Sequence, residues 1–383
     1  MIMKYIQYFL LTFLLIFATC DKDKLDVTNP NEATPDTYWE NEAQINQTLS
    51  AAYSTLQTNW SKPWGVPIIS FYPLNTKSDV VTDPGSPGNE SFVYRFNYTP
   101  LCQNFHSALT SLWSFAYQGI SFSNQVIENA DKVSSNLEQE KSEARFLRAY
   151  WYWILVNYWK DVPVLDRYPS SEKFYPAQKP ADSIWAQIEK DLNWAKERLL
   201  ANTEKGRAER GSAYALLGKA HMQQQEWSQA ADAFSEVINS GEYSLVDDYY
   251  ALFSSDNEGS DEVLFSIVWT NNKAGGIDEL HPNTMYIVPT PPPGAEGGTW
   301  GWFEMELPEW LKQEYANDTT SDGMLSKRAW GSVNFGKYSG ETEPNLYETS
   351  AEFRDTLDTS KPAFYQKYAH VTPEMDGGLN NTT

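Results

Sequence analysis

Residues 143–165 constrain the fold of this chain more than any other stretch. They read EARFLRAYWYWILVNYWKDVPVL, in which apolar residues recur at helical spacing and further aromatic residues cover the opposite side. The first face comprises Leu147, Trp151, Ile154, Leu155 and Tyr158, and the second comprises Phe146, Tyr150 and Trp153. A helix that is apolar nearly all round is buried among other helices. The stretch therefore predicts a central core helix, which Pro163 ends because a proline pushes the residue before it out of the α region.

Helical periodicity marks three further segments, at about residues 39–56, 105–130 and 183–200. Their apolar residues at helical spacing are Ile45, Leu49, Ala52, Tyr53 and Leu56, then Phe105, Leu109, Leu112, Trp113, Ala116, Tyr117 and Ile120, and last Ile184, Ile188, Leu192 and Leu199. The third segment offers Asp182 or Ser183 as its N-cap. These segments predict helices that pack beside the central one.

Residues 209–240 contain the clearest internal repeat signal. The spacing of Tyr214, Leu217, Gly218, Ala230 and Phe234 matches a tetratricopeptide repeat, a helical hairpin of about 34 residues. Gly218 is expected to let the two helices approach closely, with Ala230 as the small residue facing it. One hairpin cannot bury its own faces, so the earlier helices are predicted to form degenerate repeats stacked on this one. An unrelated α-hairpin is the alternative.

Two long regions break the helical pattern, at about residues 60–99 and 241–383. The first contains five prolines and many aromatic residues, and the second contains a β-type run at residues 263–269. A Gly- and Pro-rich aromatic stretch follows at residues 271–301, and residues 308–315 predict a short helix. Loops this long inside a compact domain are usually functional.

The N-terminus has the pattern of an export signal. Residues 1–19 hold one early positive charge and then an apolar run that is too short to span a bilayer. The run ends in small residues before Cys20, which resembles a lipobox in which that cysteine becomes the lipidated N-terminus. Thr19 departs from the usual Gly or Ala, and ordinary secretion with Cys20 as a free thiol is the alternative. Residues 20–35 are then a tether between the lipid and the domain.

Charge and composition exclude several classes of function. The formal net charge is −22, which argues against nucleic-acid binding because phosphate contacts need clustered Lys and Arg. The four histidines are scattered, no zinc-protease or serine-hydrolase motif occurs, and two cysteines form no metal cluster. We therefore expect no catalytic residues, no cofactor and no metal site. An acidic loop at residues 256–262 leaves calcium open, although a solvated loop is favoured.

The central stretch resembles the signature helix of the SusD/RagB family. The resemblance rests on Arg145, Arg148-Ala149-Tyr150, Tyr152 and the exit Asp161-Val162-Pro163-Val164-Leu165, with Lys160 in place of a usual glycine. It implies a bacterial outer-membrane lipoprotein that captures nutrients, usually glycans, at the cell surface. Arg145 and Arg148 are interpreted as structural residues that bond helix ends or Glu143.

The resemblance also implies a fold, a boundary and a partner. The fold is mainly α, with degenerate tetratricopeptide-type repeats in an α–α superhelix and long irregular, β-containing loop insertions on one face. Residues 36–383 would form one such domain, from which the C-terminal helices of the family are missing. The partner would be a SusC-like TonB-dependent outer-membrane channel that receives the captured oligosaccharide.

The candidate site combines aromatic platforms with hydrogen-bonding groups in the two loop regions. Sugars present apolar C–H faces and a ring of hydroxyls, so they need flat rings flanked by amide, carboxylate or guanidinium groups. The candidates are Trp64, Tyr72, Trp300 and Trp302 as platforms and Asn75, Asp79, Arg95 and Asn271 as hydrogen-bonding residues. The alternatives are a surface glycoside hydrolase and a repeat scaffold that binds only protein or peptide.

Overall fold

The computed structural model consists mainly of helices that pack in chain order. It describes residues 38–56, 103–168, 175–247, 249, 252, 259–268, 308–321, 323, 326, 328–329, 333–334 and 364–365. The helices are α2 (Glu42–Ser54), α5 (Gln103–Val133), α6 (Glu138–Trp159), α7 (Ala181–Arg198), α8 (Arg210–Gln223), α9 (Trp227–Asn239) and α11 (Glu309–Asn317). Two antiparallel ladders pair β1 (Val162–Pro163) with β2 (Gln178–Lys179) and β3 (Val333–Asn334) with β4 (Phe364–Tyr365).

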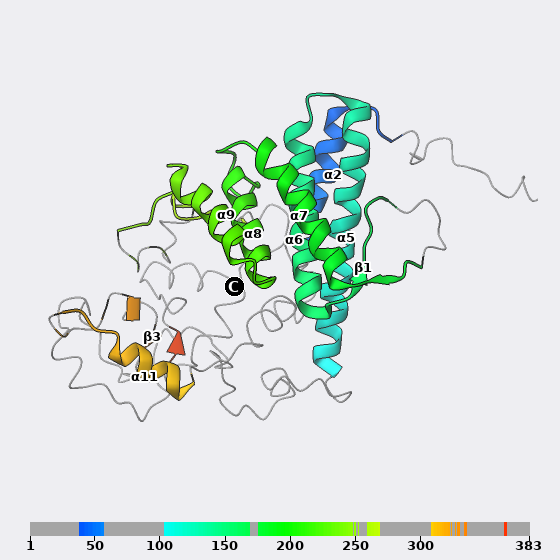
Figure 1. Ribbon diagram of the computed structural model, residues 1–383. Helices are drawn as coiled ribbons and strands as arrows, with labels where there is room; N and C mark the ends of the chain where they lie inside the picture. Colours follow the sequence, from blue (N-terminus) through cyan, green and yellow to red (C-terminus); the bar gives the residue numbers. More distant parts are fainter. Residues whose placement is uncertain are drawn as a thin grey trace, which may run out of the picture.

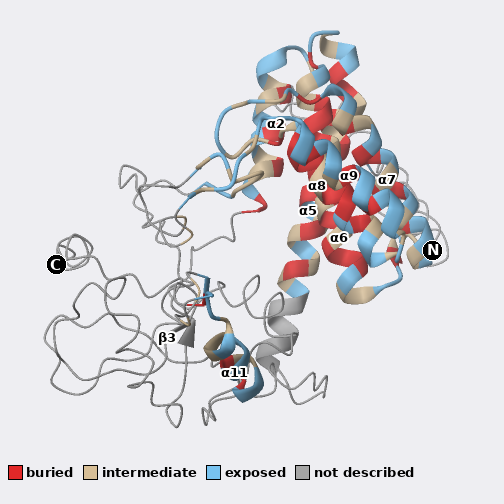
Figure 2. Ribbon diagram, turned by 60° about the vertical axis from the view of Figure 1, so that its left-hand side comes forward, coloured by how far each residue is buried: buried red, intermediate tan, exposed pale blue. Residues whose placement is uncertain are grey.

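Helices α2, α5, α6, α7, α8 and α9 form a layered stack, in which each packs against the next (Figure 1). Figure 2 shows the buried residues concentrated where these helices face one another. The largest fully buried side chains are those of Tyr152, Phe146, Ile45, Leu49, Ile120, Leu147, Leu155, Ile184, Ile188, Leu192 and Leu199. The predicted core faces of the first four helical segments are thus confirmed where their side chains are described.

Helix α6 is the centre of the stack, as its sequence predicts. Leu147 and Leu155 are buried on its first face and Phe146 on its second, and α5, α7 and α2 all pack against it. None of the helices in the described part of the chain combines the length and hydropathy that crossing a bilayer requires.

The predicted helical hairpin is present as α8 and α9. A Cβ at Gly218 would lie 2.6 Å from Cε1 of Phe234, so glycine is required for the two helices to approach this closely. The Phe234 ring lies over Gly218, and Ala230, which was predicted to face this glycine, is buried. The turn between the helices contains Gln225 with φ of +62°, and the Glu226 amide donates to the His221 carbonyl at 2.9 Å.

A buried carboxylate joins three helices. Asp191 of α7 has no exposed side-chain surface, and its Oδ1 accepts from Arg145 Nη1 at 2.9 Å and Arg148 Nη2 at 2.6 Å. Its Oδ2 accepts from Arg148 Nε and Gln187 Nε2, both at 2.8 Å. Arg148 Nη1 then donates to Asn124 Oδ1 of α5 at 2.6 Å. Both arginines are structural, as predicted, but their acceptor is Asp191 and not Glu143 or a helix end.

Burial lowers the pKa of these guanidinium groups, and pairing with Asp191 raises it. Burial disfavours the charge of Arg148, but the carboxylate of Asp191 outweighs it and raises the pKa of Arg148. For Arg145, which donates one hydrogen bond to Asp191, burial prevails and lowers the pKa. Arg148, with its bidentate contact, is the stronger partner of Asp191.

Glu143 has a different partner set, which ties α2 to α6. Its fully buried side chain accepts from Tyr53 Oη at 2.7 Å and forms an ion pair with Arg207 at 2.9 Å. The Tyr53 oxygen in turn accepts from the Ala208 amide at 2.8 Å. Burial raises the pKa of Glu143, and the hydrogen bonds and charge of Arg207 oppose that rise. This cluster fixes the segment that leads into α8.

Signature-helix residues also hold the segment that leaves α6. The Leu165 amide donates to Tyr152 Oη at 2.6 Å, and Asn124 Nδ2 donates to the Leu165 carbonyl at 3.0 Å. Asp161 Oδ1 accepts from the Ala181 amide at 3.0 Å. The predicted N-cap of α7, Asp182 or Ser183, is therefore wrong. The helix begins after Pro180, and the carboxylate at its start comes from Asp161, twenty residues earlier.

Two further predictions are corrected at the edges of the stack. Helix α6 ends at Trp159, before Pro163, because Lys160 has φ of +62° and the Asp161 amide donates to the Trp159 carbonyl at 2.8 Å, a γ-turn. Residues 263–268 form no strand, since they pair with no strand among the described residues. Instead, the Phe265 ring packs edge-on against Phe146 at a centroid distance of 5.1 Å. The predicted short helix at residues 308–315 is confirmed as α11.

We expect Asp191→Asn to lower the free energy of unfolding by about 3–5 kcal/mol, because the amide leaves the buried guanidinium of Arg148 and the half-buried one of Arg145 without their counter-charge. Urea unfolding followed by circular dichroism measures the change. The matched control is Asp232→Asn on the exposed side of α9, which should stay within about 0.5 kcal/mol of the parent. Equal losses in the two variants would contradict the role of Asp191.

We expect Lys160→Gly to stabilise the fold by about 1 kcal/mol, because glycine adopts φ of +62° without the steric cost that lysine bears. Thermal unfolding monitored by circular dichroism provides the measurement. Lys160→Ala removes the same side chain but keeps Cβ, so it should give no gain. A gain of equal size in the alanine variant would assign the effect to the lysine charge rather than to the backbone.

Candidate functional site

The residues predicted to contact a ligand lie outside the part of the chain that the structure describes. They are Trp64, Tyr72, Asn75, Asp79, Arg95, Asn271, Trp300 and Trp302. The predicted lipidation site, Cys20, also lies outside the described residues. Their roles therefore stay predictions. The signature helix, in contrast, is described throughout, and its polar residues bind other helices rather than an open surface.

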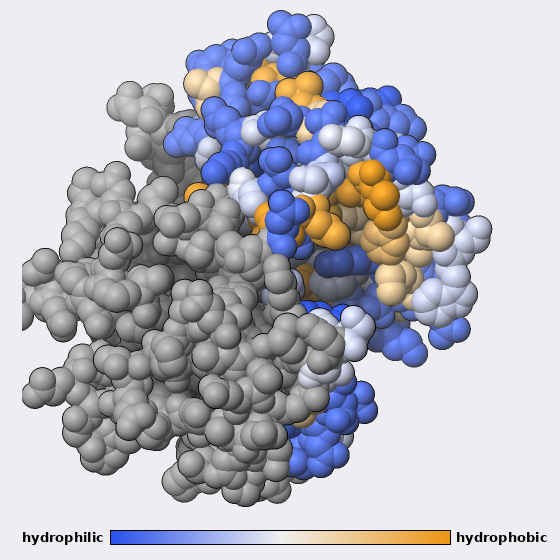
Figure 3. Space-filling view, turned by 90° about the vertical axis from the view of Figure 1, so that its left-hand side faces the viewer, coloured by the Kyte–Doolittle hydropathy of each residue, from blue (hydrophilic) through white to orange (hydrophobic). Residues whose placement is uncertain are grey.

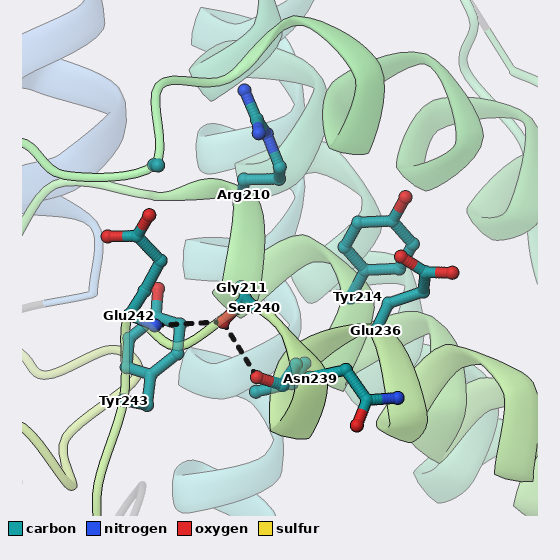
Figure 4. A pocket seen from close by; sticks show the side chains of 10 residues that line it. Arg210, Gly211, Tyr214, Glu236, Asn239, Ser240, Glu242 and Tyr243 are labelled. Atoms are coloured by element: carbon teal, nitrogen blue, oxygen red, sulfur yellow. Dashed lines mark hydrogen bonds between the residues drawn. The ribbon is translucent and has the colours of Figure 1, made fainter.

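The described residues line a half-open cavity of about 270 Å³ where α8 begins and α9 ends. Its lining comes from α8, α9, the turn that follows α9 and the segment between α7 and α8 (Figure 4). The lining residues are Ala201, Arg210, Gly211, Tyr214, Glu236, Val237, Asn239, Ser240, Glu242 and Tyr243. Ligand pockets commonly measure about 300–1,000 Å³, so this cavity suits one small polar group rather than an oligosaccharide.

The turn after α9 places Tyr243 over the start of α8. Ser240 Oγ donates to the Val237 carbonyl at 2.8 Å and accepts from the Glu242 amide at 3.1 Å (Figure 4). Tyr243 Oη donates to Glu209 Oε2 at 2.9 Å. Its ring occupies the space where any residue at 211 other than glycine would place a Cβ. Because Gly211 has no Cβ, the Tyr243 ring can pack against it and form one side of the cavity.

The cavity combines aromatic rings with groups of both charges. Burial raises the pKa of Tyr214, and the nearby charge of Glu236 raises it further. Burial and the hydrogen bond to Glu209 likewise raise the pKa of Tyr243. Both phenols therefore stay neutral at physiological pH. The sequence had not indicated this grouping of two rings with an amide, carboxylates and a guanidinium.

Other polar residues singled out in the sequence are engaged with the protein. Glu262 of the acidic loop accepts a hydrogen bond from the Val246 amide at 2.9 Å, whereas Asp256 and Glu258 lie outside the described residues. His221 Nδ1 lies 2.6 Å from Glu226 Oε2, so its ring is hydrogen-bonded. Of the described side chains, Glu189, His221 and Glu226 bring potential metal ligands within 4.8 Å of one another.

Large apolar side chains are also exposed along the stack. Trp227 and Ile238 of α9 are 62% and 75% exposed, and Leu245 after it is 82% exposed. On the face in Figure 3, apolar groups gather near the middle of the described part. The surface of the repeat layer is therefore not uniformly polar, despite the acidic composition.

Known proteins resemble this chain in sequence. A SusD-like family model, described as "Starch-binding associating with outer membrane", matches residues 23–222. The SusD-like protein P25 of Formosa agariphila is 23% identical over 290 residues, which cover 72% of this chain and 54% of that protein. The chain spans about half the length of the curated relatives it matches.

Solved structures show the same fold. A structure entitled "Laminarin binding SusD-like protein" is similar with a TM-score of 0.66 at 23% identity, over 86% of this chain and 72% of that one. Surface glycan-binding protein A from Bacteroides thetaiotaomicron, in complex with laminarihexaose, gives a TM-score of 0.63 at 21% identity, over 87% and 72%. These similarities confirm the prediction of a mainly helical fold of tetratricopeptide type.

We expect Gly211→Ala to lower the free energy of unfolding by about 1–3 kcal/mol, because the added Cβ overlaps the Tyr243 ring. In a Tyr243→Ala background the same substitution should be neutral or stabilising by up to about 1 kcal/mol, since alanine favours the helix once the ring is gone. A double-mutant cycle with urea unfolding measures this reversal. Additive effects of the two substitutions would contradict the contact.

Proposed function

Because this chain belongs to the SusD-like family, whose model is described as starch-binding and associating with the outer membrane, we propose that it is a non-catalytic lipoprotein that captures an oligosaccharide at the cell surface. The single observation behind this proposal is the family match over residues 23–222. That range contains α2, α5, α6 and α7 and most of α8, with the buried Asp191 network between them. The family match therefore covers the same residues as the helical stack from α2 to α8.

The proposed ligand is a glycan, bound by ring stacking and hydrogen bonds. The platforms are Trp64, Tyr72, Trp300 and Trp302, and the hydrogen-bonding residues are Asn75, Asp79, Arg95 and Asn271. One similar structure is entitled laminarin-binding and another holds laminarihexaose, which supports these two glycans as first probes, and the family description supports starch. Flat indole and phenol rings cover the apolar face of a sugar, while amide and charged groups satisfy its hydroxyls.

The proposed setting is the outer membrane. Lipid on Cys20 would anchor the chain, residues 20–35 would act as a tether, and residues 36–383 would belong to one ligand-binding domain. A SusC-like TonB-dependent channel would receive the bound oligosaccharide. The association of the family with the outer membrane supports this arrangement.

Calorimetric titration of the chain with laminarin, laminarihexaose and starch tests the function, together with product analysis of the same mixtures. We expect saturable binding of at least one glycan and no release of shorter sugars. Substituting Trp64, Trp300 and Trp302 by Ala together should weaken binding by at least about tenfold, or about 1.4 kcal/mol, while helicity is unchanged. The matched control is Trp227→Ala, which removes an exposed indole of α9.

Three outcomes would count against the proposal in different ways. Release of shorter sugars would identify a hydrolase. Unchanged affinity in the triple variant would place the binding site elsewhere in the chain. A folded protein that binds none of the glycans would favour a scaffold that recognises protein.

A further inference from the structure

Three side chains from three structural elements converge at the turn end of the α8–α9 hairpin. Glu189 lies on α7, His221 lies in the last turn of α8, and Glu226 is the N-cap residue of α9. One potential ligand atom from each lies within 4.8 Å of the other two. His221 Nδ1 and Glu226 Oε2 are 2.6 Å apart. All three residues are half-buried, which limits the freedom of their side chains.

The backbone and a neighbouring side chain hold this arrangement in place. Gln225 has φ of +62°, and the Glu226 amide donates to the His221 carbonyl at 2.9 Å, so the turn folds Glu226 back over His221. Gln224 Nε2 donates to Glu189 Oε1 at 2.8 Å, which orients that carboxylate across the α7–α8 contact. A hydrogen bond to a carboxylate from a second residue is how proteins orient the ligands of metal ions.

The charges of the cluster call for a cation. An ionised carboxylate only accepts hydrogen bonds, so His221 Nδ1 carries the proton in its contact with Glu226. Neither Glu189 nor Glu226 is paired with a lysine or arginine among the residues that the structure describes. Two carboxylates this close repel each other unless a positive charge lies between them. The formal charge of −22 adds to the local attraction for cations.

We propose that Glu189, His221 and Glu226 form a binding site for a divalent transition-metal ion, with Zn²⁺ as its representative, that joins α7 to the α8–α9 hairpin. Imidazole and carboxylate are zinc ligands at about 2.0–2.2 Å, which separates ligand atoms in a tetrahedral site by roughly 3.4 Å. On binding, the Nδ1 proton leaves to solvent, the 2.6 Å contact widens, and Glu189 moves inward. Three protein ligands leave the fourth position to water.

The donor set favours a transition metal over calcium or magnesium. Ca²⁺ takes six to eight oxygen ligands and Mg²⁺ requires an octahedral set of oxygens. This cluster offers two carboxylates and one imidazole, and an imidazole nitrogen suits zinc, copper, nickel or iron.

Isothermal titration of the chelator-treated, tag-free chain with Zn²⁺ tests the proposal, with Ca²⁺ titrated in parallel. We expect one Zn²⁺ per chain, an increase in the thermal unfolding temperature with Zn²⁺ and none with Ca²⁺. Co²⁺ in place of Zn²⁺ should give the visible absorption bands of a low-coordinate nitrogen–oxygen site. Glu189→Gln and His221→Gln should each weaken Zn²⁺ binding by at least about tenfold.

The controls separate this site from other ligands of the chain. Asp232→Asn on the exposed side of α9 should bind Zn²⁺ as the parent does. Circular dichroism establishes that each variant is folded, and Gln224→Ala, which removes only the hydrogen bond to Glu189, should weaken binding less than the ligand substitutions. Absence of Zn²⁺ binding by the parent, or equal affinity in the parent, Glu189→Gln and His221→Gln, would overturn the proposal. A stabilisation by Ca²⁺ alone would also overturn it.

Discussion

The buried carboxylate of Asp191 determines how the helices around α6 are oriented. A carboxylate without exposed surface is stable only if charged or hydrogen-bonding groups surround it. Arg145 and Arg148 lie three residues apart on one face of α6, and both reach Asp191 on α7. Arg148 also reaches Asn124 on α5. A helix that is apolar nearly all round can rotate about its own axis in a core at little cost. The hydrogen bonds to Asp191 and Asn124 select one such rotation for α6.

Such a network contributes specificity more than net stability. A buried ion pair regains little more than the hydration that its charges lose, so apolar residues of the same volume could stabilise the core equally well. They would not, however, select one register of α7 against α6. The same reasoning applies to Tyr152 and Asp161, whose side chains hold the backbone of Leu165 and the start of α7 through hydrogen bonds. The motif that resembles the family is thus a device for joining α6 to α7.

Helical periodicity alone predicted most of the apolar residues that these helices bury. Ile184, Ile188 and Leu192 recur at the spacing of one helical face, and the core covers that face. The partners of polar residues were not predictable in the same way. Asp191 is one acid among 51 Asp and Glu residues, and nothing in its local sequence pairs it with arginines 43 and 46 positions away. The cap from Asp161 was missed for the same reason.

The candidate sites depend even more on the path of the chain. Gly211 and Tyr243 line one cavity only because the turn at Ser240 returns the chain to the start of α8. Glu189 meets His221 only because α7 packs against α8. In the aromatic loops, composition predicts stacking platforms but does not select among 15 tryptophans. The grouping of these side chains in space was thus not predictable from the sequence.

The two ends of the α8–α9 hairpin have different chemistry and lie too far apart to share a ligand. The cavity is at the start of α8, and His221 is ten residues after Gly211, or about 15 Å along the helix. A cation at His221 therefore cannot contact a group in the cavity. It can act there only by limiting the movement of α8 and α9, which the close contact between Gly218 and Phe234 already couples. The effect of the cation on the cavity is then mechanical. Its direct electrostatic effect is largely screened at 15 Å and physiological ionic strength.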